Sequence, residues 1–239
     1  MYPIDRREIK ALARERIRTV RPSPLLVGAA FVIIGLVIQL VSVMLEFTVT
    51  EVDWAAISAG SDPMRAITYY PERETFVYNL LVTALSLVST VISVGMIIYA
   101  LRVMRGIPAG VGDLFDGFGN FFRIIWLNAV MSIFVFLWSL LLFIPGFIAS
   151  YSYSMAIYLL MDHPEWSARQ CLRESKQLMK GHKWELFVLD LSFIGWNILT
   201  LIPFVSVYVT PYMNLTRAEY YNRLVGYAAV EEEKAPWEY

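Results

Sequence analysis

The feature that most constrains the fold is one apolar stretch, Phe121 to Asp162, with the tripeptide Ile144-Pro145-Gly146 in its middle. Each half of the stretch supplies the roughly 20 apolar residues that a helix needs to cross a bilayer. A Pro-Gly pair ends or kinks a helix, so the two halves are expected to be separate. The sequence therefore predicts a membrane hairpin, with one helix running out and the next running back.

This hairpin has a second copy 58 residues further along the chain, with no gap between the copies. The shared pattern is W-x11-W-x5-I-P. The shift superposes Trp126 on Trp184, Trp138 on Trp196 and Ile144-Pro145 on Ile202-Pro203. An internal repeat of this kind predicts two similar structural units, each with two spans.

The composition indicates a polytopic membrane protein. Hydrophobic residues make up 57% of the chain and charged residues 17%, whereas about 25% of the residues of a soluble domain are charged. The single cysteine, Cys171, excludes a disulfide within the chain. Two histidines and one cysteine at no ligand spacing predict no metal site, and no cofactor is expected.

The apolar runs predict an all-α fold with six transmembrane helices in a single membrane domain of residues 1–239. The expected parts are a basic helix at 1–24, spans one and two at 25–101 with an outer loop at 46–75, spans three and four at 102–161, an amphipathic helix with spans five and six at 162–224, and an acidic tail at 225–239.

Each pair of spans follows an amphipathic segment, at residues 4–20, 112–122 and 165–180. The apolar residues of 4–20 recur at helical spacing with arginines on the other face, which predicts a helix lying flat on an anionic membrane surface. Every pair starts on the same side, so the repeats are parallel. The expected architecture is three helical hairpins related by a pseudo-threefold axis.

The basic residues predict the orientation of the chain. With six spans and the N-terminus inside, 18 of the 20 Lys and Arg residues fall on the inner side, and only Arg65 and Arg73 fall outside. This skew follows the positive-inside rule. The expected location is the cytoplasmic membrane of the cell, with both chain ends in the cytoplasm.

Four sequence blocks resemble a bacterial family known as domain of unknown function 975. The blocks are GDLFDGFGNFFR, FLWSLLLFIPGFIASYSYSMAIYLL, SARQCLRESKQLMKGHKWELFVLDLSFIGW and PYMNLTRAEYY. The resemblance covers residues 4–20 and 75–224 and implies a six-span protein. It implies no reaction, ligand or catalytic residue.

Asp190 is the acidic residue expected well inside a span, where a carboxylate costs roughly 2.5–3.5 kcal/mol on insertion scales. The repeat superposes it on Ser132, and Asn197 on Ser139, which predicts an inward-facing polar face. Two roles remain open: a structural carboxylate bonded to hydroxyls or to a lysine, and a proton or cation relay. Other polar interior candidates are Gln39 in the first span and Thr83, Ser86 and Thr90 in the second.

Two further groups of residues are candidates for binding. Four tyrosines are expected to line a groove or to pack as membrane aromatics: Tyr151, Tyr158, Tyr208 and Tyr212. Six basic residues of the amphipathic segments are candidates for lipid headgroups: Arg14, Arg18, Arg169, Arg173, Lys176 and Lys180.

These features leave three functional hypotheses. The expected one is a non-enzymatic membrane protein that binds lipid, a membrane partner or a second copy of itself. The alternative is a transporter or channel with a polar path along Asp190, Asn197 and the Ser/Thr stripe of span two. An intramembrane enzyme is least expected, because no paired acid and base lie at one depth and no nucleophile motif occurs. No nucleic-acid partner is expected.

Overall fold

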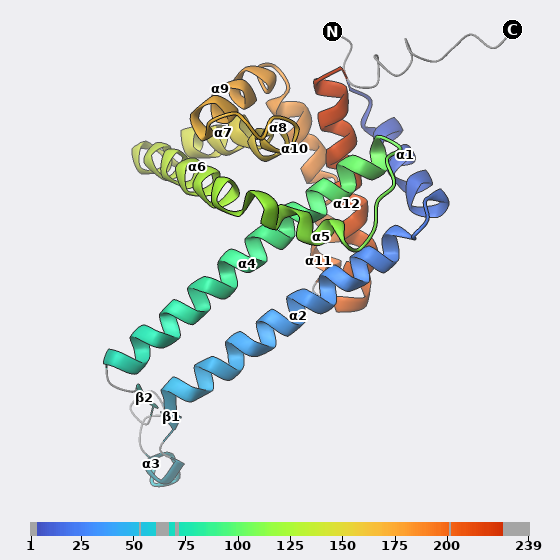
Figure 1. The fold of residues 1–239 in the computed structure, drawn as a ribbon. Coiled ribbons are helices and arrows are strands. Elements are labelled where there is room, and N and C mark those ends of the chain that lie inside the picture. Colours follow the sequence, from blue (N-terminus) through green and yellow to red (C-terminus); the bar gives the residue numbers. More distant parts are fainter. Residues whose placement is uncertain (1–3, 53, 61–66, 70–71, 201, 227–239) are drawn as a thin grey trace, which may run out of the picture. The chain divides into compact units, whose positions relative to one another are not determined.

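The computed structural model describes residues 4–52, 54–60, 67–69, 72–200 and 202–226 (Figure 1). These residues belong to two compact units, one of residues 1–32 and 91–239 and the other of residues 33–90. Helices α2 (Pro24–Val49) and α4 (Glu72–Met104) each contribute residues to both units. The expected acidic tail falls outside the described residues beyond Gly226.

The unit of residues 33–90 holds the predicted outer loop. Strands β1 (Thr50–Val52) and β2 (Ile67–Tyr69) pair antiparallel, with Glu51 opposite Thr68, and the short helix α3 (Trp54–Ser58) lies between them in sequence. The fold is helical as predicted, with this short hairpin as an addition.

Among the described residues, four helical segments are long and apolar enough to cross a membrane: Pro24–Glu46, Phe76–Met104, Asp113–Leu140 and Ile144–Asp162. They correspond to the first four predicted spans. Large apolar side chains are exposed along them, among them Leu36, Leu80 and Phe136. Apolar surface of this extent is typical of helices that face lipid, and the prediction of several helices long and apolar enough to cross a membrane is confirmed.

The fourth span is interrupted. It follows α6 (Phe121–Leu141) and consists of α7 (Phe143–Tyr153) and α8 (Ala156–Asp162). The Ser154 hydroxyl donates to the Tyr151 carbonyl at 2.9 Å. Bonds of this kind from serine to the preceding turn compete with the helical ladder and bend a helix.

The predicted fifth and sixth spans differ more from expectation. The fifth consists of α10 (Lys183–Leu191) and α11 (Ile194–Leu199), which are separated at Ser192 and Phe193. The sixth is α12 (Pro203–Leu224), a helix that is polar for its length. Neither is among the four long apolar helices of the described residues. The six-span count therefore stays a prediction.

The first amphipathic segment is α1 (Arg6–Thr19). Asp5 caps its N-terminus, and the Asp5 carboxylate accepts a hydrogen bond from the Arg7 backbone amide. Its apolar face, Ile9, Ala13 and Ile17, is buried, and α1 lies beside α12 (Figure 1). The expectation of a helix that lays this face on the membrane surface is therefore wrong. The amphipathic pattern is satisfied within the protein.

The other two amphipathic segments bury only part of their apolar side chains within the protein, and Phe115, Phe118 and Phe122 are exposed. Residues 112–122 form α5 (Asp113–Asp116) and the 3-10 helix η1 (Gly117–Asn120), where Leu114 is fully buried. The segment predicted at 165–180 is α9 (Ala168–Leu178). It starts later than expected, because Ser167 caps its N-terminus.

One hydrophobic core joins α9 to the first turns of α6, to α8 and to the second half of α4. It consists of Val91, Val94, Ile124, Leu127, Ala156, Leu160, Ala168, Cys171 and Leu172. Burial raises the pKa of the Cys171 thiol, so this cysteine is a packing residue rather than a nucleophile.

Helix α4 approaches α5 closely because Gly95 has no side chain. A Cβ at Gly95 would overlap the backbone of Leu114, and one at Gly117 would lie 2.7 Å from the Val91 carbonyl oxygen. Small residues at such contacts are how membrane helices reach backbone-to-backbone distance. By contrast, a Cβ at Gly35 would meet nothing within 4 Å in the described structure.

Gly95→Ala is therefore expected to destabilise the protein by about 1–3 kcal/mol, the usual cost of forcing extra volume into a packed contact. Gly35→Ala is the matched control, because the same methyl group enters open space there. Thermal unfolding in detergent, followed by tryptophan fluorescence, measures both. Equal melting temperatures for the two variants would contradict this account of the α4–α5 contact.

Candidate functional site

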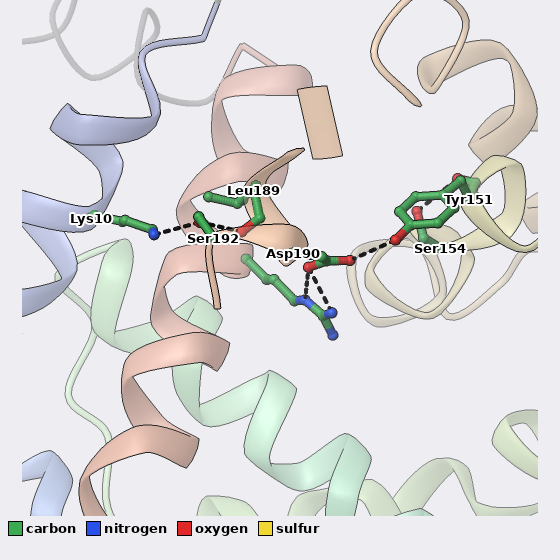
Figure 2. Close-up of polar contacts among 7 residues, drawn as sticks. Lys10, Tyr151, Ser154, Leu189, Asp190 and Ser192 are labelled. Atoms are coloured by element: carbon green, nitrogen blue, oxygen red, sulfur yellow. Dashed lines mark hydrogen bonds and ion pairs between the residues drawn. The ribbon is translucent and has the colours of Figure 1, made fainter. Parts of the chain in front are cut away.

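Asp190, near the end of α10, binds an arginine and a tyrosine from two other helices. One carboxylate oxygen accepts from Nη2 of Arg217 on α12 at 2.8 Å and from Nε at 3.2 Å. The other accepts from the Tyr151 hydroxyl on α7 at 3.3 Å. Figure 2 shows Asp190 between the tyrosine and the guanidinium. The three side chains thus join α7, α10 and α12.

The helical backbone is interrupted close to Tyr151 and close to Asp190, the two residues that face each other here. Ser154 follows Tyr151 by three positions, and Ser192 follows Leu189 by three. Each serine hydroxyl donates to the carbonyl three residues earlier, which is Tyr151 for Ser154 and Leu189 for Ser192 (Figure 2). Two neighbouring helices are therefore interrupted at the same contact.

Helix α1 contacts the second of these interruptions. The Lys10 ammonium donates to the Ser192 hydroxyl at 2.5 Å (Figure 2). It also lies 4.1 Å from the centre of the Phe193 ring. Burial lowers the pKa of Lys10, with the neighbouring Arg14 and Arg6 acting in the same direction. The basic N-terminal helix is thus attached directly beside Asp190.

The sequence identified Asp190 but not its charged partner. A lysine was expected, and Lys183 lies seven residues away on the same helix, but the cation is Arg217. Arg217 was counted among the basic residues expected on the inner side of the membrane. Tyr151 was a groove candidate and instead supplies the hydroxyl.

The other polar interior candidates lie in three different places. Asn197 lines a polar groove of about 330 Å3 on α11 and α12. Ser132 and Ser139 line a mainly apolar groove of about 520 Å3 on α6, α7 and α8. The remaining candidates belong to the unit of residues 33–90, where all four are exposed or half-buried: Gln39, Thr83, Ser86 and Thr90.

The four candidate tyrosines have separate environments. Tyr158 is buried and packs on Tyr221, with ring centres 5.2 Å apart. Tyr208 and Tyr212 pack on each other at 5.9 Å, and the Tyr212 hydroxyl accepts from Arg14 at 3.2 Å. The structure therefore does not form a single groove lined by all four tyrosines.

A second polar network, which sequence reasoning missed, joins α4, α8 and α12. The Arg105 guanidinium donates to both oxygens of Asp162, at 2.7 and 2.8 Å, and to the Asn222 side chain at 3.0 Å. The Tyr221 hydroxyl donates to Asp162 at 2.7 Å. The signal available in the sequence was a basic and an acidic residue at the ends of neighbouring predicted spans.

A third network attaches α1 to the end of α12. Arg223 donates to both oxygens of Glu8, at 2.8 and 2.9 Å, and to Glu219 at 3.0 Å. The hydrogen bonds from Arg223, together with its charge, lower the pKa of the Glu8 carboxyl. The bond between α1 and α12 therefore persists to a pH below the ordinary pKa of a glutamate.

The six headgroup candidates keep their charged ends accessible, and all are exposed: Arg14, Arg18, Arg169, Arg173, Lys176 and Lys180. Within the described residues, no group of three His, Cys, Asp or Glu side chains is placed to hold a metal ion.

The comparison with protein families gives one match. Residues 139–228 match the family described as "Protein of unknown function (DUF975)". The match contains Tyr151, Asp190 and Arg217 and ends after α12. The chain has no match among curated proteins or among solved structures. Over residues 139–228, the chain is similar to the DUF975 family.

Proposed function

We propose that the protein is a non-enzymatic, multi-pass membrane protein whose basic inner face binds anionic lipid headgroups or a membrane partner, including a second copy of the chain. One observation carries the proposal. The apolar faces of α1 and α9 are buried, while their basic side chains, including Arg18, Arg169 and Arg173, are exposed. Each basic residue near an anionic membrane surface contributes about 1 kcal/mol of attraction.

The topology that accompanies this proposal has six spans as three parallel hairpins, with both chain ends on the cytoplasmic side of the cell membrane. The element bounds support it. When α6 (121–141) is shifted by 58 residues, it falls on residues 179–199, which hold α10 and α11. The same shift moves the start of α7 to a position two residues before the start of α12. A helix that is buried in protein over its polar part, as α12 is from Val209 to Leu224, tolerates polar residues within a span.

In this proposal Asp190 is a structural residue. Its carboxylate is bonded to Arg217 and Tyr151, and the bonds join three helices. An ion pair with a further hydroxyl donor offsets the cost of placing a carboxylate among apolar helices. No catalytic step is assigned to it.

A specific observation favours a second candidate, a transporter or channel with a polar path. The groove of about 330 Å3 on α11 and α12 extends to the ion pair at Arg217. Its polar lining residues on α12 follow one another at steps of three and four: Ser206, Thr210, Asn214 and Arg217. Asn197 of α11 and Thr200, which directly follows α11, complete the polar lining. Steps of this size keep side chains on one helix face.

Replacing Arg169, Arg173 and Lys180 together by Gln is expected to reduce the enrichment of phosphatidylglycerol over phosphatidylcholine around the protein severalfold. The reason is the loss of three exposed cations at the inner surface. Mass spectrometry of lipids that copurify with the protein from mixed-lipid nanodiscs measures the enrichment. Arg65→Gln with Arg73→Gln is the control, because both residues are expected on the outer side. Unchanged enrichment in the triple variant would overturn the lipid proposal.

Asp190→Asn, Arg217→Gln and the double variant distinguish the two candidate functions. A structural ion pair predicts that each single variant lowers the melting temperature and that the double variant is less than additive, with a coupling of about 1 kcal/mol. Asn197→Ala, in the neighbouring groove, is expected to leave stability unchanged. Ion and proton flux in reconstituted vesicles is the second measurement. Flux that Asp190→Asn abolishes without a loss of stability would favour the polar path instead.

A further inference from the structure

An apolar groove of about 200 Å3 lies beside α7 and has two lysines on its lining. Its apolar residues are Trp138 of α6 and Pro145, Ile148 and Ala149 of α7, and its basic residues are Lys176 of α9 and Lys183 of α10. Ser152 and Tyr153 complete the lining. The groove is therefore apolar along one helix and cationic where two other helices meet it.

The two lysines differ from the interior arginines because they have no acidic partner within the described part of the chain. Arg105, Arg217 and Arg223 each bind a carboxylate, whereas no ion pair there includes Lys176 or Lys183. Gly181, with φ of +91°, forms the turn between α9 and α10 that separates the two lysines in sequence. Both ammonium groups are thus available to an anion from outside the chain.

The apolar part of the groove suits a hydrocarbon chain. The Ser152 hydroxyl donates to the Ile148 carbonyl at 2.7 Å, and the Ser152 carbonyl accepts from Ser175 at 2.9 Å. Both polar groups of Ser152 are therefore already bonded. The walls that remain include the rings of Trp138 and Pro145 and the side chains of Ile148 and Ala149, which offer mainly apolar contact area.

We propose that this groove holds one acyl chain of an anionic lipid, whose phosphate binds Lys176 and Lys183. A groove of this volume is below the range of about 300–1,000 Å3 that holds a drug-sized ligand, so it fits a chain rather than a whole two-chain lipid. Burial of each methylene and the attraction between phosphate and ammonium act together. The inference rests on the proposed lipid function and assigns it a discrete site.

The test uses the full-length protein in phosphatidylcholine nanodiscs and a brominated lysophosphatidylglycerol as the probe. Bromine quenches tryptophan fluorescence at close range, and Trp138 lies on the groove. We expect saturable quenching that Trp138→Phe largely removes. Lys176→Gln with Lys183→Gln is expected to weaken binding about tenfold. Arg65→Gln with Arg73→Gln, which removes two cations expected on the outer side, is expected to bind as the unchanged protein does.

Two further arms test the chain and the headgroup separately. Ile148→Trp, at a half-exposed position on the groove wall, is expected to block the chain and abolish the Trp138-dependent quenching. Brominated lysophosphatidylcholine is expected to bind at least tenfold more weakly, and glycerol 3-phosphate is not expected to displace the probe. Equal binding of the two lysolipids, displacement by glycerol phosphate, or unchanged binding in the double-lysine variant would each overturn the site.

The failure of this site is distinguishable from failure of the lipid function. The Arg169, Arg173 and Lys180 variant leaves both groove lysines in place. If that variant loses phosphatidylglycerol enrichment while the double-lysine variant binds the probe normally, the proposal that the exposed basic residues bind lipid is supported. The proposed groove site is then wrong. If both variants behave as the unchanged protein does, the lipid function is wrong as well.

Discussion

The ion pair between Asp190 and Arg217 is the interaction on which the C-terminal half of the chain depends. A carboxylate among apolar helices is costly unless it is paired and hydrogen-bonded. Here it meets a guanidinium at 2.8 Å and a tyrosine hydroxyl at 3.3 Å. Because these groups come from α10, α12 and α7, satisfying one charge fixes three helices. The same requirement explains why α12 is polar: it also supplies Tyr221 to Asp162 and Arg223 to Glu8.

The amphipathic helices show what a hydrophobic period can predict and what it cannot. The spacing of Ile9, Ala13 and Ile17 predicts that one face of α1 is covered, and that face is buried. The period does not identify what covers this face, because lipid and the packed surface of a neighbouring helix can both bury apolar side chains. Here the cover is protein, which leaves the arginines as the part of α1 that meets its surroundings. In the proposed function, this helix therefore contributes to membrane binding through its charges rather than through its apolar face.

Apolar length predicted the first four spans and their approximate ends, since that property is local. The interruptions at Ser154 and Ser192 were not predicted, because a serine that bonds its own helix has the same sequence pattern as one that faces a neighbour. Asp190 was identified because a carboxylate inside a span has a high free-energy cost, and this too can be recognised from the local sequence. Arg217 was not, because it lies 27 residues further along the chain and pairing between distant residues depends on the tertiary structure.

Arginines and lysines occupy different kinds of site in this structure. Arg105 and Arg223 each donate to both oxygens of one carboxylate, which the planar fork of a guanidinium allows and a lysine ammonium does not. Arginines therefore suit the fixed contacts between helices. Lys176 and Lys183 are compact charges on flexible stems, which suit a phosphate whose position varies with its chain. This division follows from what each side chain can bind, and it explains why the interior networks use arginine while lysines lie on the apolar groove beside α7.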